Sequence, residues 1–480
     1  MGAIISSLPG SVAGGVGIVV VGERKRDTRE PVDIVASVFF DGTGNNRTNT
    51  TLRLEQAKGG YVSVDGRQVK VEGSYESYYS NVAVMQYMNL ISDNLKEVSV
   101  YVEGIGTTDG GDDDTMGMAF GAGATGVPAK VARGILLLTE RITRILRQSA
   151  EGEGEGKRLN HLLVNVCGFS RGAAAARHFV ARRTGELFKQ YTSLSESLYV
   201  EAAAIEINFV GLFDTVSSYG GEEHTTVAGQ TIHNRLDHSF DDDVQELHLA
   251  IGGHAREVVQ LAAADEYRKN FASTTIASSV RAGVGLEVRL PGVHSDIGGS
   301  YQEHEEEVRN VSAADAQGYI REQWYTAAQL EPINVFRRWY QGRRTLTHHY
   351  QFIALAIMIN QAKGGGKHEP MKFETFEGDN QKYAVPDELR PLYELMNAFV
   401  ASRPAPSFGE AKPGLPPTHN DDYSHYQPAA YELLPEWYKI RNRYLHRSAR
   451  KGEWTVKGLT MAGRETKHVP DRQIIQDLTP

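Results

Sequence analysis

A serine flanked by glycines stands between an apolar run and an alanine-rich run of this chain. The segment 168–172 reads Gly-Phe-Ser-Arg-Gly, the run 162–167 before it is mostly apolar, and the four residues after it are alanines. A nucleophilic serine at a sharp strand-to-helix turn has this pattern, because a glycine two residues to either side lets strand and helix approach. We therefore interpret Ser170 as a nucleophile and Gly168 and Gly172 as the glycines of its turn. The alternative is a glycine-lined turn whose serine has no chemical role.

A serine hydroxyl is a poor nucleophile unless a histidine removes its proton and a carboxylate orients that histidine. In folds with this turn the chain order is serine, acid, histidine. Asp214 fits as the acid because it closely follows the apolar run 205–212, although a turn or helix-capping aspartate is the alternative. Six histidines lie between Asp214 and residue 300: His224, His233, His238, His248, His254 and His294. We favour His294, which lies in a glycine-containing loop after the strand-like residues 288–290, whereas the segment 244–264 around two of the others is predicted to be helical.

An ester carbonyl that is attacked by a serine develops negative charge on its oxygen, which backbone amides stabilise. The amide of Arg171 lies at the N-terminus of the helix predicted after Ser170, where the helix dipole also favours negative charge. A second amide is expected from the loop after the first strand, from Gly42 or Thr43. Asp41 in the same loop would repel that charge, so we expect its carboxylate to be held by loop amides or to pair with Arg171.

The elements that must position these residues are visible as apolar runs. Four β-branched, apolar runs predict buried strands at residues 34–40, 98–102, 162–167 and 205–212. Apolar residues at helical spacing predict a helix over 128–148, and a further helix begins near Arg171. Strands that alternate with helices form a parallel sheet, and reactive groups collect beyond the carboxyl ends of its strands. The predicted fold class is therefore α/β, an α/β-hydrolase-like, mainly parallel sheet with helices on both faces and a C-terminal cap or lid.

The 480 residues divide into three predicted regions. Residues 1–30 are a flexible lead-in, residues 31–302 form the catalytic core, and residues 303–480, with all four tryptophans, form the cap or lid and a membrane-contact region. The uncharged stretch 2–21 precedes a positive cluster instead of following one, so we expect neither a signal peptide nor a membrane span there.

Charge and cysteine content exclude several classes of protein. The net charge of -9 argues against a nucleic-acid partner, because phosphate binding needs a basic surface. Cys167 is the only cysteine, which excludes an intrachain disulfide and a cysteine-based zinc site. We expect no cofactor; two aspartate clusters are candidates for calcium, but neither has EF-hand spacing and solvated loops are favoured. These clusters are Asp109, Asp112, Asp113 and Asp114, and Asp241, Asp242 and Asp243.

The C-terminal part of the chain has the opposite charge. Between Trp437 and Arg472 there are ten Lys or Arg against three Asp or Glu, in a protein that is acidic as a whole. Basic and aromatic residues together favour an anionic bilayer surface. The alternative is that the same residues pack the cap.

The motifs that hold these residues occur together in a known family. They read Phe-Phe-Asp-Gly-Thr-Gly-Asn-Asn at 39–46, Gly-Phe-Ser-Arg-Gly-Ala at 168–173, Gly-Leu-Phe-Asp-Thr-Val at 211–216 and Pro-Gly-Val-His-Ser-Asp-Ile-Gly-Gly at 291–299. In order, over about 260 residues, they resemble the α/β-hydrolase family of bacterial type VI secretion lipase effectors. The resemblance implies a triad of Ser170, Asp214 and His294, and phospholipase A activity on the membranes of a rival bacterium.

The same resemblance implies a cellular setting. It implies synthesis in the bacterial cytoplasm, export without a cleaved signal peptide, and action in the periplasm or membrane of the target cell. It also implies a cognate immunity protein and a secretion spike component as partners.

The sequence thus predicts a serine esterase that hydrolyses acyl esters of glycerophospholipids. Two alternatives stay open. One is a triad hydrolase acting on a soluble ester, thioester or amide, and the other is a non-catalytic adaptor whose hydrolase-like core only binds a partner.

Overall fold

The structure is a computed structural model, and it describes most of the chain. The described ranges are 29–91, 96–147, 157–182, 205–218, 243–268, 271–334, 339–364, 368–402, 436, 439–447 and 474–477, with the backbone of 224–227 and 230–233. The predicted lead-in, residues 1–30, lies almost wholly outside these ranges.

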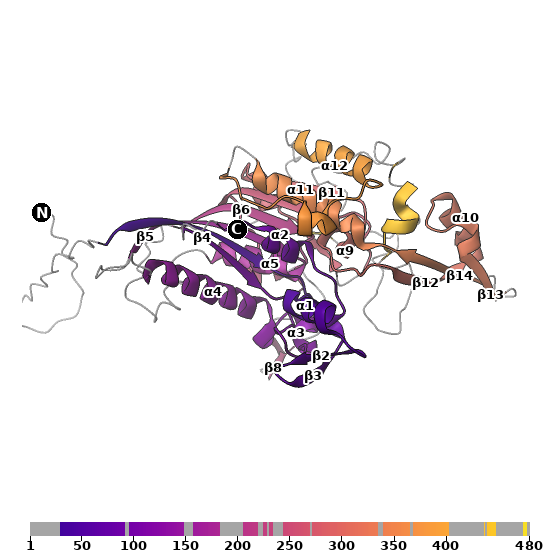
Figure 1. Cartoon of the computed structure of the whole chain (residues 1–480), viewed down its shortest axis with the longest axis horizontal. Coiled ribbons are helices and arrows are strands. Elements are labelled where there is room, and N and C mark those ends of the chain that lie inside the picture. Colours follow the sequence, from indigo (N-terminus) through magenta and orange to yellow (C-terminus); the bar gives the residue numbers. More distant parts are fainter. Residues whose placement is uncertain are drawn as a thin grey trace, which may run out of the picture.

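The centre of the molecule is a six-stranded sheet in which every adjacent pair is parallel (Figure 1). Its spatial order is β11 (Gly285–Leu290), β9 (Ala255–Ala263), β6 (Ile205–Phe213), β5 (Arg158–Phe169), β1 (Pro31–Phe40) and β4 (Glu97–Val102). The four predicted strands lie inside β1, β4, β5 and β6. Their β-branched residues are buried because helices cover both faces of the sheet, which confirms the predicted α/β class.

One face of the sheet is covered by α4 (Val127–Arg147) and α5 (Arg171–Ala181). The apolar stripe of α4 is buried against the sheet, as its helical spacing predicts. Alanines at the start of α5 are fully buried, so this helix lies close to the strands. The helix predicted over 128–148 is confirmed within one residue at each end.

The opposite face is covered by α2 (Asn81–Met88), α9 (His294–Gly298) and α11 (Gln351–Lys363), with α12 (Arg390–Ser402) outside α11 (Figure 1). Almost every residue of α11 is buried. The strand β15 (Ile474–Ile475) pairs with β10 (Ser273–Thr274), which lies beside the core. The core therefore does not end at the predicted boundary between residues 302 and 303, because part of the predicted cap completes it.

The segment 244–264, predicted to be helical, is mostly a strand. Only α7 (Asp243–Glu246) is helical there, and β9 begins at Ala255. β9 is hydrogen-bonded to β6 on one side and β11 on the other, and nearly all of it is buried. Pairing on both sides thus overrides the helix-forming composition of the segment, so this prediction is wrong.

A three-stranded antiparallel unit projects from one end of the molecule (Figure 1). We call it the arm, and it contains β12 (Glu305–Ser312), α10 (Ala313–Arg321), β13 (Leu330–Asn334) and β14 (Trp339–Leu346). The remaining elements are α1 (Arg47–Gln56), β2 (Tyr61–Val64), β3 (Arg67–Lys70), α3 (Thr115–Phe120), β7 (His224–Val227), β8 (Gln230–His233) and α8 (Ala277–Arg281). No helix among the described residues combines the length and the apolar character that a membrane crossing requires.

Candidate active site

The turn at Ser170 has the strained backbone that a nucleophile at a strand-to-helix junction needs. Ser170 joins β5 to α5 with φ 58° and ψ -128°, a conformation that non-glycine residues rarely adopt. A Cβ atom at Gly172 would lie 2.2 Å from the carbonyl oxygen of Asp41, and one at Gly168 would lie 2.4 Å from that of Gly172. Both positions therefore require glycine, and the turn presents Ser170 at the carboxyl edge of the sheet.

Asp214 and His294 meet at the same edge. Asp214 directly follows β6 and is fully buried, and its Oδ2 lies 2.6 Å from Nδ1 of His294, the first residue of α9. The other oxygen, Oδ1, accepts a hydrogen bond of 2.9 Å from the amide of Ala263 in β9. The structure thus joins the predicted acid to the predicted base across 80 residues of sequence.

The imidazole of His294 lies over the serine turn. Its ring centroid is 4.7 Å from that of Phe169, the residue before Ser170, and 4.9 Å from that of Phe271 on another side. The Ser170 amide donates to the carbonyl of Phe213, the neighbour of Asp214, over 3.0 Å. The turn at Ser170 therefore lies close to Asp214 and His294.

Burial sets the charge of the histidine. It lowers the pKa of His294 from its usual value of 6.5, while the hydrogen bond to Asp214 opposes this shift. The imidazole is therefore neutral at physiological pH. Because the Asp214 carboxylate accepts at Nδ1, the proton stays there and Nε2 keeps a lone pair that can remove a proton.

Two of the three predicted oxyanion donors remain available. The Gly42 amide already donates to Oδ1 of Asp41 over 2.7 Å. The Thr43 amide has no hydrogen-bond partner among the described residues, and the side chain of Arg171 holds this loop by donating from Nε to Oγ1 of Thr43 over 2.8 Å. The structure therefore favours Thr43 over Gly42 as the partner of the Arg171 amide.

Three hydrogen-bond donors hold the carboxylate of Asp41, the residue expected to repel an oxyanion. The Gly42 amide, Oγ of Ser80 at 2.5 Å and Oη of Tyr101 at 2.6 Å all donate to its buried carboxylate. Burial nevertheless raises the pKa of Asp41, and these hydrogen bonds oppose the shift. One expected resolution, hydrogen bonding within the loop, thus matches the structure. Ser80 and Tyr101 were missed, since they lie 39 and 60 residues away with no local sequence signal.

Comparisons with known proteins bear on the predicted family resemblance. Residues 183–317 match the family model "T6SS, Phospholipase effector Tle1-like, catalytic domain", a span that includes Asp214 and His294. The fold is similar to a structure of the Tle1 effector bound to the VgrG spike from the type VI secretion system, with a TM-score of 0.53 and 19% identity over 97% of this chain and 98% of that one. The predicted resemblance to type VI secretion lipase effectors is confirmed.

Other comparisons add little. A crystal structure of an uncharacterized protein from Pseudomonas aeruginosa covers 78% of this chain with 51% of its own length, at 19% identity and a TM-score of 0.44. No curated protein matches the chain.

Around the candidate site, carboxylates hold the loop that contains His294. Asp265 accepts from the Gly292 amide over 2.8 Å, and Glu266 accepts from the His294 amide over 3.3 Å. Burial raises the pKa of Asp265 to about 6. Further along, Nδ1 of His446 lies 2.7 Å from Oδ1 of Asp296. These anchors were also missed, because they come from the segment after β9 and from the C-terminal part of the chain.

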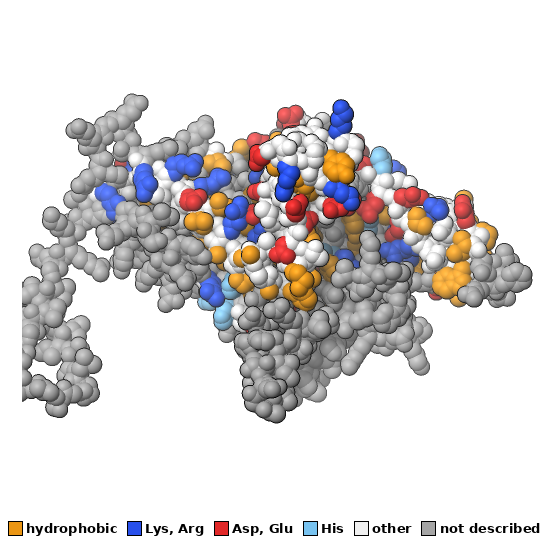
Figure 2. All heavy atoms as spheres, turned by 90° about the horizontal axis from the view of Figure 1, so that it is seen from below, with side chains coloured by type: hydrophobic (Ala, Val, Ile, Leu, Met, Phe, Trp, Pro, Cys, Tyr) orange, Lys and Arg blue, Asp and Glu red, His pale blue; other side chains and the backbone are white. Residues whose placement is uncertain are grey.

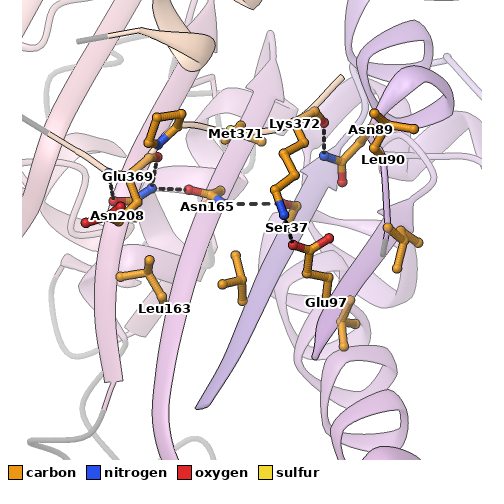
Figure 3. Close-up of a pocket in the computed structure, with 14 residues that line it drawn as sticks. Ser37, Asn89, Leu90, Glu97, Leu163, Asn165, Asn208, Glu369, Met371 and Lys372 are labelled. Carbon is orange, nitrogen blue, oxygen red and sulfur yellow. Dashed lines mark hydrogen bonds and ion pairs between the residues drawn. The ribbon is translucent and has the colours of Figure 1, made fainter. Parts of the chain in front are cut away.

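A cavity of about 220 Å³ lies on the α2 and α11 side of the sheet, and its lining includes none of Ser170, Asp214 and His294. Figure 3 shows the side chains that line it. Asn208 donates to Oδ1 of Asn165 over 2.7 Å, and Asn165 donates to Oγ of Ser37 over 3.3 Å. Asn208 also holds the backbone of Glu369 through two hydrogen bonds. The polar groups of this cavity thus fix the segment above it, and its volume is below the roughly 300 Å³ of typical ligand pockets.

The acidic loop considered as a calcium candidate makes hydrogen bonds and ion pairs with protein groups. Asp113 accepts from the amide and the hydroxyl of Ser74, both over 2.7 Å, and Asp114 caps α3 by accepting from the Gly117 amide over 3.0 Å. Asp109 lies 3.9 Å from Arg133, and Asp112 lies 3.6 Å from Arg67. In the second cluster, the residues at 241 and 242 lie outside the described ranges.

The described part of the basic C-terminal segment packs the cap. The guanidinium of Arg441 lies 4.5 Å from the Trp324 ring, and that of Arg447 lies 4.2 Å from the Tyr319 ring. Arg441 is also buried. For these residues the structure favours packing over membrane contact, and most of the segment lies outside the described ranges.

Proposed function

We propose that the chain is a serine esterase that hydrolyses acyl esters of glycerophospholipids, a phospholipase A. One observation carries the proposal: the 2.6 Å contact of Asp214 with His294 lies beside the strained turn at Ser170. A serine, a neutral imidazole and a buried carboxylate together suit acyl transfer. The match to the Tle1-like phospholipase domain supports a lipid ester as substrate.

Each residue has one role in the proposed reaction. Oγ of Ser170 attacks the ester carbonyl while Nε2 of His294 takes its proton, and Asp214 stabilises the imidazolium that forms. The amides of Arg171 and Thr43 hold the oxyanion. The imidazolium then protonates the leaving lysophospholipid alkoxide, which leaves an acyl-serine. Water, deprotonated by the same imidazole, releases the fatty acid and restores the serine.

The arm offers a surface for contact with the bilayer. Three large apolar side chains are exposed on its strands, Val308 at 41%, Ile333 at 49% and Trp339 at 37%. Figure 2 shows hydrophobic side chains beside charged ones at the end of the molecule that the arm forms. An exposed tryptophan with aliphatic neighbours suits the membrane interface.

We further propose an antibacterial role after export through a type VI secretion system. The chain would bind a spike component, as the Tle1 effector of similar fold is bound to VgrG, and a cognate immunity protein would protect the producer. The site of action would be the periplasm or membrane of the target cell.

Fatty acid released from phospholipid liposomes tests the enzymatic proposal. We expect Ser170→Ala to lower turnover by more than about 10³-fold, because the remaining groups supply no nucleophile. Ser99→Ala is a matched control, since Ser99 is a buried serine of the same sheet, and it should stay near the wild-type rate.

Three outcomes would contradict the proposal. Equal loss in both variants would indicate a folding defect and no special role for Ser170. Activity on short soluble esters with none on liposomes would favour a soluble substrate, and retained liposome activity in Ser170→Ala would remove the mechanism.

A further inference from the structure

Three side chains with metal-binding chemistry converge where the chain enters and leaves the arm. Glu303 lies between α9 and β12, while His348 and His349 begin the short helix η7 (His348–Tyr350) that leads from β14 into α11. Their ligand atoms all lie within 4.8 Å of one another. Nδ1 of His348 is 3.3 Å, and Nε2 of His349 is 3.9 Å, from the same Oε2 of Glu303.

These separations fit a transition-metal ion. Zinc binds imidazole nitrogen and carboxylate oxygen at about 2.0–2.2 Å in tetrahedral geometry, so two of its ligand atoms lie roughly 3.3 Å apart. The His348 to Glu303 distance already has this value, and the His349 to Glu303 distance of 3.9 Å would shorten by about 0.6 Å on binding. Imidazole ligands favour zinc over calcium or magnesium, which prefer oxygen.

His348 presents a nitrogen that lacks a hydrogen bond. Its Nδ1 is buried and makes no hydrogen bond to any described residue, although it faces a carboxylate oxygen. A buried nitrogen without a hydrogen-bond partner is unfavourable, and a metal ion bound at this nitrogen would satisfy it. The ring cannot easily turn away, because it stacks on Tyr78 with centroids 4.3 Å apart and meets Phe352 edge-on at 5.5 Å.

Neighbouring groups orient the other two ligands. Oγ1 of Thr347 lies 3.1 Å from Nδ1 of His349, so a proton held there leaves the lone pair on Nε2 toward Glu303. The His348 amide donates to Oε2 of Glu303 over 3.2 Å and fixes that carboxylate. Outer partners of this kind are typical of metal ligands. Glu303 and His349 are 31% and 35% exposed in their side chains, which leaves a path for an ion and for water.

We propose that Glu303, His348 and His349 bind one zinc ion, with water in the fourth position. The ion would tie the segment after α9 to the start of α11. These segments already contact each other, since the Ser300 amide donates to Oε1 of Gln351 over 3.0 Å. Because α9 begins with His294, zinc bound here would stabilise the part of the fold that holds the base.

Zinc titration of the full chain, freed of metal with a chelator, tests the proposal. Calorimetry should give one ion per chain, and zinc should raise the melting temperature. Glu303→Gln and His349→Asn should each weaken zinc binding at least about 10-fold. Mutation of a residue that only hydrogen-bonds to a metal ligand already causes a loss of this size.

His161→Asn is the matched control. His161 is 37% exposed and lies 3.4 Å from Glu206. Among the described residues, this pair is not part of a group of three side chains that could hold a metal ion. This variant should bind zinc like the wild type. Cobalt in place of zinc adds a second readout, because visible absorption of a tetrahedral ion should be lost in the two site variants alone.

Three results would overturn the proposal. The first is that the wild-type chain fails to bind zinc. The second is that the two site variants bind zinc as tightly as the wild type, and the third is that His161→Asn weakens zinc binding as much as the site variants do. Because His349 is partly exposed, its substitution should leave the metal-free melting temperature unchanged, which separates a lost ligand from a lost fold.

Discussion

Asparagine at position 214 should abolish most activity while leaving the fold in place. In the structure, Oδ1 of Asp214 accepts from the Ala263 amide over 2.9 Å, and Oδ2 lies 2.6 Å from Nδ1 of His294. The carbonyl oxygen of an asparagine must therefore face Ala263, because the Ala263 amide is a donor. If the asparagine amino group faced it instead, two donors would point at each other. The amino group then faces His294, whose Nδ1 must become the acceptor.

That change places the imidazole proton on the wrong nitrogen. Nε2 of His294 would carry a hydrogen and could no longer take the proton of Ser170. In a serine, histidine and aspartate triad, this tautomer costs about 10⁴-fold in turnover. At 1.36 kcal/mol for each tenfold change, the barrier rises by about 5 kcal/mol.

Stability should change much less than turnover. The lost charged hydrogen bond costs about 1.5–3 kcal/mol, and removal of a buried charge offsets part of it. The assay is fatty-acid release from liposomes together with urea unfolding of the same preparations. Asp33→Asn, at an exposed position of β1, is the control and should match the wild type in both. Turnover of Asp214→Asn within tenfold of the wild type would refute this reasoning.

Three further predictions follow from the site and the core. Because burial lowers the pKa of His294 below 6.5, its base form persists into acid, so the acid limb of kcat/KM should lie below pH 6.5; a limb above it would contradict the assignment. Gly172→Ala should cost at least about 1–3 kcal/mol in urea unfolding, because its Cβ would lie 2.2 Å from the Asp41 carbonyl oxygen, and an unchanged midpoint would count against this turn. Asp477→Ala should cost about 3–5 kcal/mol in the same assay, since it removes the 2.6 Å partner of fully buried Arg177; a cost below 1 kcal/mol would show that other groups neutralise this arginine.

Much of the sheet could be predicted because its strands are locally distinctive. The runs inside β1, β4, β5 and β6 are short, apolar and β-branched, as strands buried on both faces must be. The turn at Ser170 was also visible, because its glycines are required by local contacts. Asp214 and His294 could be proposed from their places after strands, but their 2.6 Å contact is a property of the folded sheet.

Other features depend on contacts that the sequence does not display. β9 contains Ala, Glu, Gln and Leu, which suit a helix, and only its pairing with β6 and β11 decides for a strand. The place of α11 had a usable signal, since apolar residues surround this helix on all sides and so indicate full burial. The partners of Asp41 had none, because a serine and a tyrosine far along the chain are ordinary residues until the fold assembles them.

Covalent labelling of the native chain with a fluorophosphonate, read by mass spectrometry of its peptides, tests the central claim most directly. The account predicts one adduct, on Ser170, that forms rapidly in the wild type and is lost when His294 is replaced by alanine. An adduct on a different residue, no adduct at all, or equal labelling without His294 would contradict it.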